Sequence, residues 1–218
     1  MLDHMTVHET NEALTRAFYN KIVEPGDHVI DLGAHVGHHT RELSRLVGPG
    51  GIVHAFEPNI DHFQALLAIG ANVRLWPFAA GNELQTVKLH VPRGLDGWAS
   101  IQDIRAELAD RTFDIIDTIQ VCIDDLSEIE QAKITFIKAD VERRELYALL
   151  GMLKLLRAAR PTLVIENVSG EILALLSGLD YLVTDLYGGD WNGRHHLPNS
   201  VAFPLEKRVP VTRLLWTS

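Results

Sequence analysis

Short apolar segments alternate along this chain with segments that repeat apolar residues at helical spacing. Between residues 9 and 23, Leu14, Phe18 and Ile22 recur at four-residue steps, the pattern of a helix with one buried stripe. The run H-V-I-D-L at 28–32 is typical of a strand buried on both faces. Because crossovers between parallel strands require intervening helices, the alternation predicts an α/β fold. We expect a doubly wound, mostly parallel sheet with helices on both faces.

The expected elements continue this alternation along the chain. Strands are expected at 28–32, 51–56, 73–78, 119–123, 134–140, 162–166, 181–186 and 201–204, and helices at 9–23, 40–47, 61–69, 144–160 and 170–177. Residues 83–91 alternate as in an exposed or edge strand, and a loop follows them, so 83–114 is expected to be an inserted hairpin or flap. A chain of 218 residues is expected to form one domain, 1–218.

Charge and cysteine content argue against several classes of protein. The 20 Lys and Arg residues against 29 Asp and Glu give a formal net charge of −9, which repels nucleic-acid backbones. No window approaches the roughly 18 uninterrupted apolar residues of a membrane span, and residues 1–10 lack the cationic start and apolar stretch typical of an export signal. Cys122 is the only cysteine, so a reducing compartment is expected. We expect a cytoplasmic protein without nucleic-acid or membrane partners, and the oligomeric state stays open.

A strand ending in an acidic residue leads into a glycine turn in V-I-D-L-G-A-H-V-G, residues 29–37. Gly33 and Gly37 allow a ligand to approach the backbone closely. A dinucleotide-binding turn needs glycine at the two further positions that His35 and His38 occupy here, so a nicotinamide or flavin dinucleotide fits poorly. The turn therefore favours a ligand without a pyrophosphate.

S-adenosylmethionine fits this turn better, because it has no phosphates and carries a cationic amino group and a sulfonium. Asp31 at the end of the first strand could hold such a cation. Glu57 ends the next strand, 20 residues after Gly37, where doubly wound folds place the acid that binds ribose hydroxyls. The two carboxylates predict a nucleoside site at this edge of the sheet.

Three further carboxylates follow later strands. Asp140 and Glu142 lie two residues apart at one strand end, and Glu166 closes the next strand. Together they could supply a general base whose pKa is raised by its neighbours, or oxygen ligands for Mg²⁺; the sequence leaves both open. His35, His38 and His39 lack the spacing of a zinc pair on a helix and no cysteine supports them, so a dedicated zinc site is not expected. In loop 188–199, His195 could contact an acceptor.

Several motifs together resemble the FkbM-type family of S-adenosylmethionine-dependent methyltransferases. The similarity covers about residues 22–170 and rests on D-L-G-A-H-V-G-H-H-T, H-A-F-E-P-N, V-C-I-D-D-L and I-K-A-D-V-E-R-R-E. The resemblance implies that Asp31, Gly33 and Gly37 line the methionine part of the cofactor, that Glu57 binds its ribose, and that Phe78 and Ala79 approach its adenine. Ala34 and Pro58 belong to the same motifs and are expected there too. It also implies transfer to a hydroxyl of a small molecule or sugar.

One position departs from the family pattern, because Arg143 stands where the family has a glycine after D-V-E. Arg143 could pair with Glu142 and lower its pKa, which would weaken a base role for Glu142. We expect an S-adenosylmethionine-dependent O-methyltransferase with catalytic candidates Asp140, Glu142, Glu166 and His195. Two alternatives stay open: a nicotinamide-dependent oxidoreductase, and a catalytically silent nucleotide-binding or interaction protein.

Overall fold

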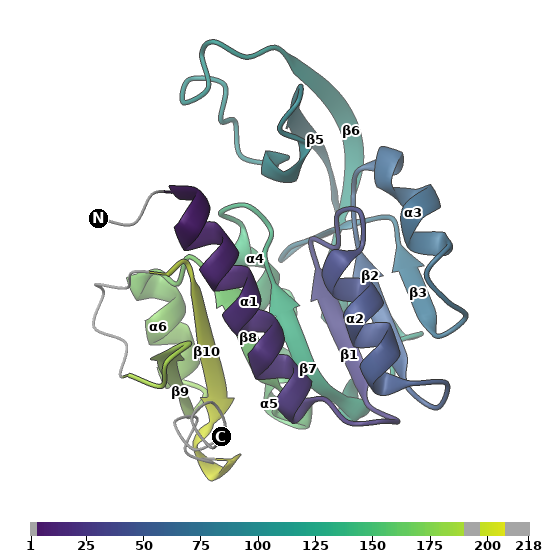
Figure 1. Cartoon of the computed structure of the whole chain (residues 1–218), viewed down its shortest axis with the longest axis vertical. Coiled ribbons are helices and arrows are strands. Elements are labelled where there is room, and N and C mark those ends of the chain that lie inside the picture. The colour runs from purple at the N-terminus through teal and green to yellow at the C-terminus, as the bar shows by residue number, and fades with distance from the viewer. Residues whose placement is uncertain (1–3, 190–196, 208–218) are drawn as a thin grey trace.

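A seven-stranded sheet forms the centre of the molecule in the computed structural model, which describes residues 4–189 and 197–207 (Figure 1). Its strands are β1 (His28–Leu32), β2 (Ile52–Phe56), β3 (Val73–Trp76), β7 (Ile134–Ala139), β8 (Thr162–Glu166), β9 (Tyr181–Asp185) and β10 (Asn199–Pro204). Their order is β3-β2-β1-β7-β8-β10-β9. The pairs from β3 to β8 are parallel, whereas β10 runs antiparallel to β8 and β9. The mostly parallel sheet is confirmed.

Helices cover both faces of this sheet. The α-helices are α1 (His4–Ile22), α2 (His38–Val47), α3 (Phe63–Leu67), α4 (Glu145–Leu150), α5 (Leu153–Ala159) and α6 (Gly170–Ser177), and the short 3₁₀ helices are η1 (Ile60–His62), η2 (Asp96–Trp98), η3 (Ile123–Asp125), η4 (Gln131–Lys133) and η5 (Leu205–Lys207). Successive side chains of a strand point to opposite faces. Val29 packs in one core cluster with Phe18 of α1 and Leu43 of α2, and Ile30 packs in another with Leu149 of α4. The expected doubly wound arrangement is therefore present.

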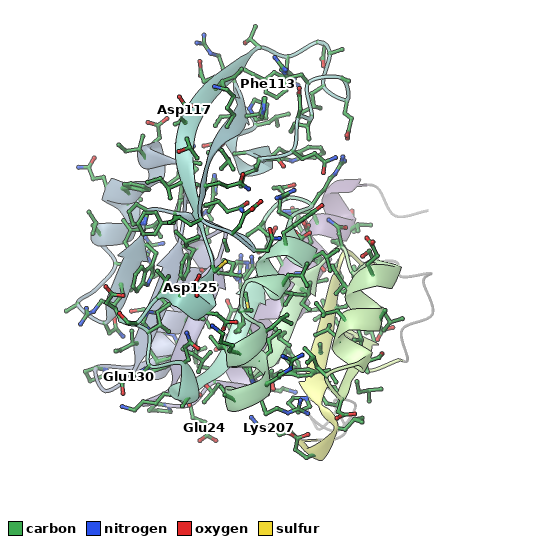
Figure 2. The ribbon with its side chains drawn as sticks, turned by 180° about the vertical axis from the view of Figure 1, so that it is seen from behind. Glu24, Phe113, Asp117, Asp125, Glu130 and Lys207 are labelled. Atoms are coloured by element: carbon green, nitrogen blue, oxygen red, sulfur yellow. The ribbon has the colours of Figure 1, made fainter. Side chains whose placement is uncertain are left out.

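A long hairpin rises beyond the sheet edge where the parallel strands end (Figures 1 and 2). Its strands β5 (Gln85–Pro92) and β6 (Phe113–Val121) pair antiparallel along their length, and β4 (Ala79–Ala80) joins β6 in a second, three-stranded sheet. The insertion expected at 83–114 thus extends to Val121. The strand expected at 119–123 is the end of β6, because cross-strand pairing with β5 continues into that segment.

Two expected helices differ from the structure. The helix expected at 144–160 is divided into α4 and α5 at Gly151 and Met152. Gly151 lies so close to Gly81 that an added Cβ would be 1.7 Å from the carbonyl oxygen of Gly81. Asp124 then caps the second helix, since its carboxylate accepts hydrogen bonds from the backbone N–H groups of Lys154 (2.7 Å) and Leu155 (2.9 Å). The helix expected at 61–69 is shorter, as η1 followed by α3.

The N-terminal helix expected at 9–23 is observed as α1, which begins earlier in the chain and ends at Ile22. Its residues Phe18 and Tyr19 are almost completely buried against the sheet. None of the helices in the described part of the chain is long and apolar enough to cross a membrane. The interpretation of 1–218 as one domain stays a prediction.

Candidate active site

The glycine turn joins β1 to α2 at the edge where the parallel strands end. Gly33 and Gly37 adopt positive φ angles of 75° and 86°, a region that side chains disfavour. A Cβ on Gly33 would lie 1.8 Å from the carbonyl oxygen of Asp140, so only glycine fits there. The N–H groups of Gly33 and Ala34 each donate to the carbonyl of Phe56 at 3.0 Å. The turn is therefore held against the ends of both neighbouring strands.

Glu57 follows the end of β2 and is held by backbone donors. Its Oε2 accepts a hydrogen bond from the N–H of His35 (2.7 Å), and its Oε1 accepts one from the N–H of Asn59 (2.8 Å). The side chain is buried, yet it contributes to the wall of a cavity. Each carboxylate oxygen has a second lone pair, so Glu57 can accept further hydrogen bonds from hydroxyl groups of a ligand.

Asp31 and Gly37 lie behind the cavity wall rather than in it. Asp31 is fully buried, and its Oδ2 accepts a hydrogen bond from the Thr40 hydroxyl at 2.6 Å. Its Oδ1 is buried and finds no hydrogen-bond partner among residues 4–189 and 197–207. Gly37 packs against Ile69, whose Cδ1 would lie 2.5 Å from an added Cβ. Direct contact of Asp31 or Gly37 with a cofactor stays a prediction.

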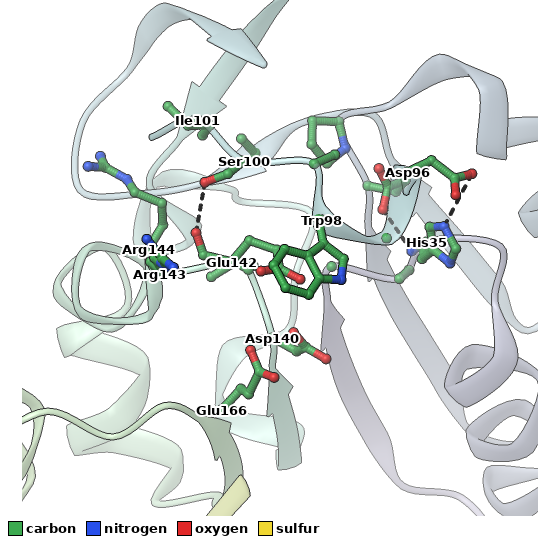
Figure 3. Close-up of a pocket in the computed structure, with 18 of the residues that line it drawn as sticks. His35, Asp96, Trp98, Ser100, Ile101, Asp140, Glu142, Arg143, Arg144 and Glu166 are labelled. Carbon is green, nitrogen blue, oxygen red and sulfur yellow. Dashed lines mark hydrogen bonds and ion pairs between the residues drawn. The ribbon is translucent and has the colours of Figure 1, made fainter. Parts of the chain in front are cut away.

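A cavity of about 530 Å³ lies between the glycine turn, the strand ends and the hairpin (Figure 3). Most of the expected site residues line it, namely Gly33, Ala34, Glu57, Pro58, Phe78, Ala79, Asp140, Glu142 and Glu166. The hairpin loop adds Asp96, Trp98 and Ser100. Helix α1 adds Glu12, which sequence analysis missed because nothing local to the helix indicates that it reaches this edge. The expected contact His195 lies outside the described residues.

Asp140, Glu142 and Glu166 come together at the ends of β7 and β8 as a carboxylate cluster (Figure 3). One carboxylate oxygen from each lies within 4.8 Å of the others. Lys138, almost completely buried in β7, donates from Nζ to Asp140 Oδ2 at 2.8 Å. Asn167 donates from Nδ2 to Glu166 Oε2 at 2.9 Å. The sequence-based expectation that these three acids meet is confirmed.

Proximity and burial change the proton affinity of this cluster. Burial, together with the charges of Asp140 and Glu145, raises the pKa of Glu142 from 4.5 to about 7. Burial and the charges of Asp140 and Glu142 also raise the pKa of Glu166. The neighbouring acids Asp140 and Asp31 raise the pKa of Lys138 despite its burial, so Lys138 stays charged. One ammonium therefore faces three carboxyl groups, of which at least one holds a proton near neutral pH.

Arg143 forms a surface ion pair, but its partner is Glu107 rather than Glu142. Its guanidinium contacts Glu107 Oε1 in the hairpin loop at 2.5 Å. The backbone φ angles are 50° at Glu142 and 70° at Arg143, both in the left-handed region. The carbonyl oxygen of Glu142 accepts a hydrogen bond from the Ser100 hydroxyl (2.8 Å). The charge of Arg143 still lowers the pKa of Glu142, but burial and the acids Asp140 and Glu145 outweigh it, so Glu142 remains a candidate base.

The wall contributed by α1 carries a second ionised group. Glu12 Oε2 contacts His39 Nε2 at 2.9 Å, and the Tyr19 hydroxyl lies 3.1 Å from the other ring nitrogen of His39. Burial opposes ionisation of Glu12, but the hydrogen bond and charge of His39 lower its pKa to about 2. The α1 side of the cavity therefore carries a Glu12–His39 pair.

Known proteins share both the sequence pattern and the fold. Residues 31–183 match the model of the methyltransferase FkbM domain. Methyltransferase FkbM from Methylobacillus flagellatus KT superposes with a TM-score of 0.53 at 21% identity over 81% of this chain and 43% of that chain. A putative rRNA-methylase from Clostridium thermocellum superposes with a TM-score of 0.53 at 14% identity, over 88% of this chain and 93% of that chain. A putative O-methyltransferase from Klebsiella pneumoniae superposes with a TM-score of 0.51 at 13% identity, over 89% of this chain and 80% of that chain.

These structural similarities show a common fold. A comparison with curated proteins found no match. The chain spans less than half the length of the Methylobacillus protein. The matched family segment begins at Asp31 and ends in β9 at Val183, so it includes the glycine turn, Glu57 and the carboxylate cluster. With more than half of its residues matched by the family model, the chain belongs to the FkbM methyltransferase domain family.

Proposed function

We propose that this chain binds S-adenosylmethionine in the cavity and transfers its methyl group to a hydroxyl of a small-molecule or sugar acceptor. One observation carries the proposal: Glu57 and the carboxylate cluster of Asp140, Glu142 and Glu166 open into the same cavity. Glu57 is suited to bind a nucleoside. The second is suited to bind and deprotonate an acceptor, so cofactor and acceptor would meet in one enclosed space.

The residues present fit the cofactor in shape and charge. Glu57 is oriented by two backbone N–H groups and has lone pairs for ribose hydroxyls. Phe78 and Ala79 line the cavity where an adenine ring would need apolar contacts. The carboxyl groups of Glu57, Asp96 and Asp140 line the cavity and give it an acidic character. A cationic ligand is therefore favoured over a phosphate-bearing one, which supports the methyl donor over a nicotinamide dinucleotide.

When bound, S-adenosylmethionine supplies an electrophilic methyl group on a good leaving group. The remaining requirement is an acceptor oxygen whose proton can leave, and Glu142 is placed for that step. A carboxylate with a pKa of about 7 is ionised in an appreciable fraction near neutral pH and is more basic than an ordinary glutamate. Glu142 would take the hydroxyl proton on a carboxylate oxygen. Protonated Glu166 would donate a hydrogen bond, and Asp140 would stay paired with Lys138.

Mg²⁺ is a second way to use the same cluster. Three carboxylate oxygens within 4.8 Å of one another are hard ligands that Mg²⁺ accepts, and a bound ion would activate an acceptor hydroxyl as a Lewis acid. Methyl transfer measured with EDTA and with added Mg²⁺ separates the two cases. Activity that survives EDTA supports Glu142 as the base, whereas activity that requires the ion supports the metal.

A small acceptor is favoured by the size and charge of the site. The net charge of −9 and the negative cavity oppose approach of a nucleic-acid backbone. Hairpin-loop residues Trp98 and Ser100 line the cavity, which leaves limited space beside a nucleoside. The similar Clostridium protein carries the description of a putative rRNA-methylase. An rRNA fragment therefore belongs among the acceptors tested, and we expect it to remain unmethylated.

Calorimetry with S-adenosylhomocysteine tests the proposal directly. We expect binding by the parent protein and a loss of about 10–100-fold in affinity for Glu57→Gln, because a charge-assisted hydrogen bond to ribose is worth about 1.5–3 kcal/mol. An exposed matched control, Glu24→Gln, should bind like the parent. No binding by the parent, or NADH binding more tightly than S-adenosylhomocysteine, would refute the proposal. Product analysis after incubation with hydroxylated acceptors then tests transfer to oxygen.

A further inference from the structure

Two histidines and an aspartate from three separate segments meet at the cavity beside Glu57. His35 belongs to the glycine turn, His62 ends η1, and Asp96 begins η2 in the hairpin loop. One donor atom from each lies within 4.8 Å of the others, and all three residues line the cavity. We propose that His35, His62 and Asp96 form a binding site for a divalent transition-metal ion, with Zn²⁺ as the best match.

Donor distances match the coordination geometry of zinc. Asp96 Oδ2 lies 3.2 Å from His62 Nε2 and 3.6 Å from His35 Nε2. Zinc binds imidazole nitrogen and carboxylate oxygen at about 2.0–2.2 Å in tetrahedral sites, which places neighbouring ligand atoms about 3.3 Å apart. Small side-chain adjustments would therefore bring an ion within bonding distance of all three atoms. Two imidazoles and one carboxylate also form a donor set that zinc accepts.

Glu57 lies near the ring nitrogen of His62 that would face away from the ion. His62 is almost completely buried, and its Nδ1 faces Glu57 Oε1 at 3.5 Å while its Nε2 faces Asp96. A carboxylate at Nδ1 favours the tautomer with the proton on that nitrogen, which leaves the Nε2 lone pair for a metal. The ring thus lies between two carboxylates, although its Nδ1 makes no hydrogen bond within the described residues.

His35 supplies an observation that simple ion pairing leaves unexplained. Its Nε2 is buried and accepts or donates no hydrogen bond to the described part of the chain. Its separation of 3.6 Å from Asp96 Oδ2 is too long for a hydrogen bond. A protonated His62 alone could bridge Glu57 and Asp96, but it would leave the nitrogen of His35 unsatisfied. A metal ion satisfies it.

The site would connect segments that are distant in the sequence. An ion held by His35, His62 and Asp96 would tie the hairpin loop to the glycine turn and to η1. Three protein ligands leave a fourth tetrahedral position, and because the ligands line the cavity this position would be open to water or to a bound molecule. The site uses none of the residues of the carboxylate cluster.

Calorimetric titration of chelator-treated protein with Zn²⁺, in the absence of any methyl donor, tests the inference. The parent should bind one Zn²⁺ per chain, and His62→Ala and Asp96→Ala should lose at least tenfold in affinity. His35→Asn removes the imidazole while keeping a residue that tolerates the φ of 51° at this position, so it should also lose binding. His38→Ala is the matched control, since His38 lines the same cavity but stands outside the cluster, and it should bind like the parent.

Three further measurements make the result decisive. Co²⁺ bound to the parent should show the visible absorption of a tetrahedral site, and Glu57→Gln should weaken Zn²⁺ binding about 10–100-fold through loss of support for His62. Circular dichroism of each apo variant confirms that it is folded. The proposed site would be overturned if His62→Ala bound Zn²⁺ as tightly as the parent. It would also be overturned if His38→Ala lost as much Zn²⁺ affinity as the variants of the three ligands. S-adenosylhomocysteine binding is measured separately, so failure of the metal site is distinguishable from failure of the proposed function.

Discussion

Replacing Glu142 by glutamine is expected to stabilise the protein, and the gain should depend on pH. The pKa of Glu142 is 4.5 in an ordinary environment and about 7 in the fold. Between these values the folded state holds a proton that the unfolded state releases, so the free energy of unfolding falls as pH rises through this window. At pH 8 the folded protein carries an ionised carboxylate beside Asp140 and Glu145, whereas glutamine at that position carries no charge.

The magnitude follows from the shift. A change of 2.5 pKa units corresponds to at most about 3.4 kcal/mol at about 1.36 kcal/mol per unit. Glu142 is partly exposed, and solvent and local rearrangement screen its charge, so we expect a gain of about 1–2 kcal/mol at pH 8. At pH 4 the carboxyl of the parent is protonated in both states. The variant should then have the stability of the parent.

Urea unfolding of the parent and Glu142→Gln at pH 4 and pH 8 measures this difference. Glu24→Gln, which removes an exposed carboxylate in the segment between α1 and β1, is the control and should change stability little at either pH. An equal effect of Glu142→Gln at both pH values would refute the reasoning, as would a loss of stability at pH 8. Methyl transfer should decrease sharply in the same variant, because the proposed base is missing while the fold is retained.

The remaining predictions concern the reaction and two backbone features. The kcat/KM for methyl transfer should rise with pH and level off above about 7 as Glu142 ionises, which a pH–rate profile measures; a flat profile would exclude Glu142 as the base. Gly33→Ala should lower the free energy of unfolding by about 3 kcal/mol or more, because the added Cβ would overlap the Asp140 carbonyl. Gly26 has a similar φ, but an added Cβ there would meet no atom within 4 Å, so Gly26→Ala should lower the free energy of unfolding by only about 1 kcal/mol. Thermal unfolding compares the two, and equal losses would contradict the steric argument. Asp124→Ala should cost about 1–2 kcal/mol by removing the cap of α5, and an unchanged melting temperature would show that the cap is dispensable.

The sheet could be predicted because its determinants are local. In the segment 28–32 every residue is buried, and its apolar residues alternate between the core clusters of the two faces. The observed β1 and β8 have the expected bounds. Glu57, Asp140 and Glu166 could be assigned to one edge because the ends of parallel strands meet there. Strand order therefore predicts that these carboxylates gather at one edge of the sheet.

Features that depend on contacts between distant segments could not be predicted. Nothing within 144–160 shows that Gly151 meets Gly81 or that Asp124 caps the second half of the expected helix. The cluster of His35 with His62 and Asp96 was missed because spacing along one helix was the criterion for a histidine metal site. The three residues are brought together only by the hairpin, whose position over the glycine turn depends on tertiary packing.

The departure at Arg143 shows how such contacts change the meaning of a motif. Two consecutive residues, Glu142 and Arg143, have left-handed backbone angles, which cost about 1–2 kcal/mol each outside glycine. The hairpin offsets this cost, because Ser100 donates to the carbonyl of Glu142 and Glu107 pairs with Arg143. A glycine at 143 would relieve the strain but release one connection to the hairpin. Arg143 therefore accepts a strained backbone conformation and in return connects the segment of the carboxylate cluster to the hairpin loop. It does not form an ion pair with Glu142.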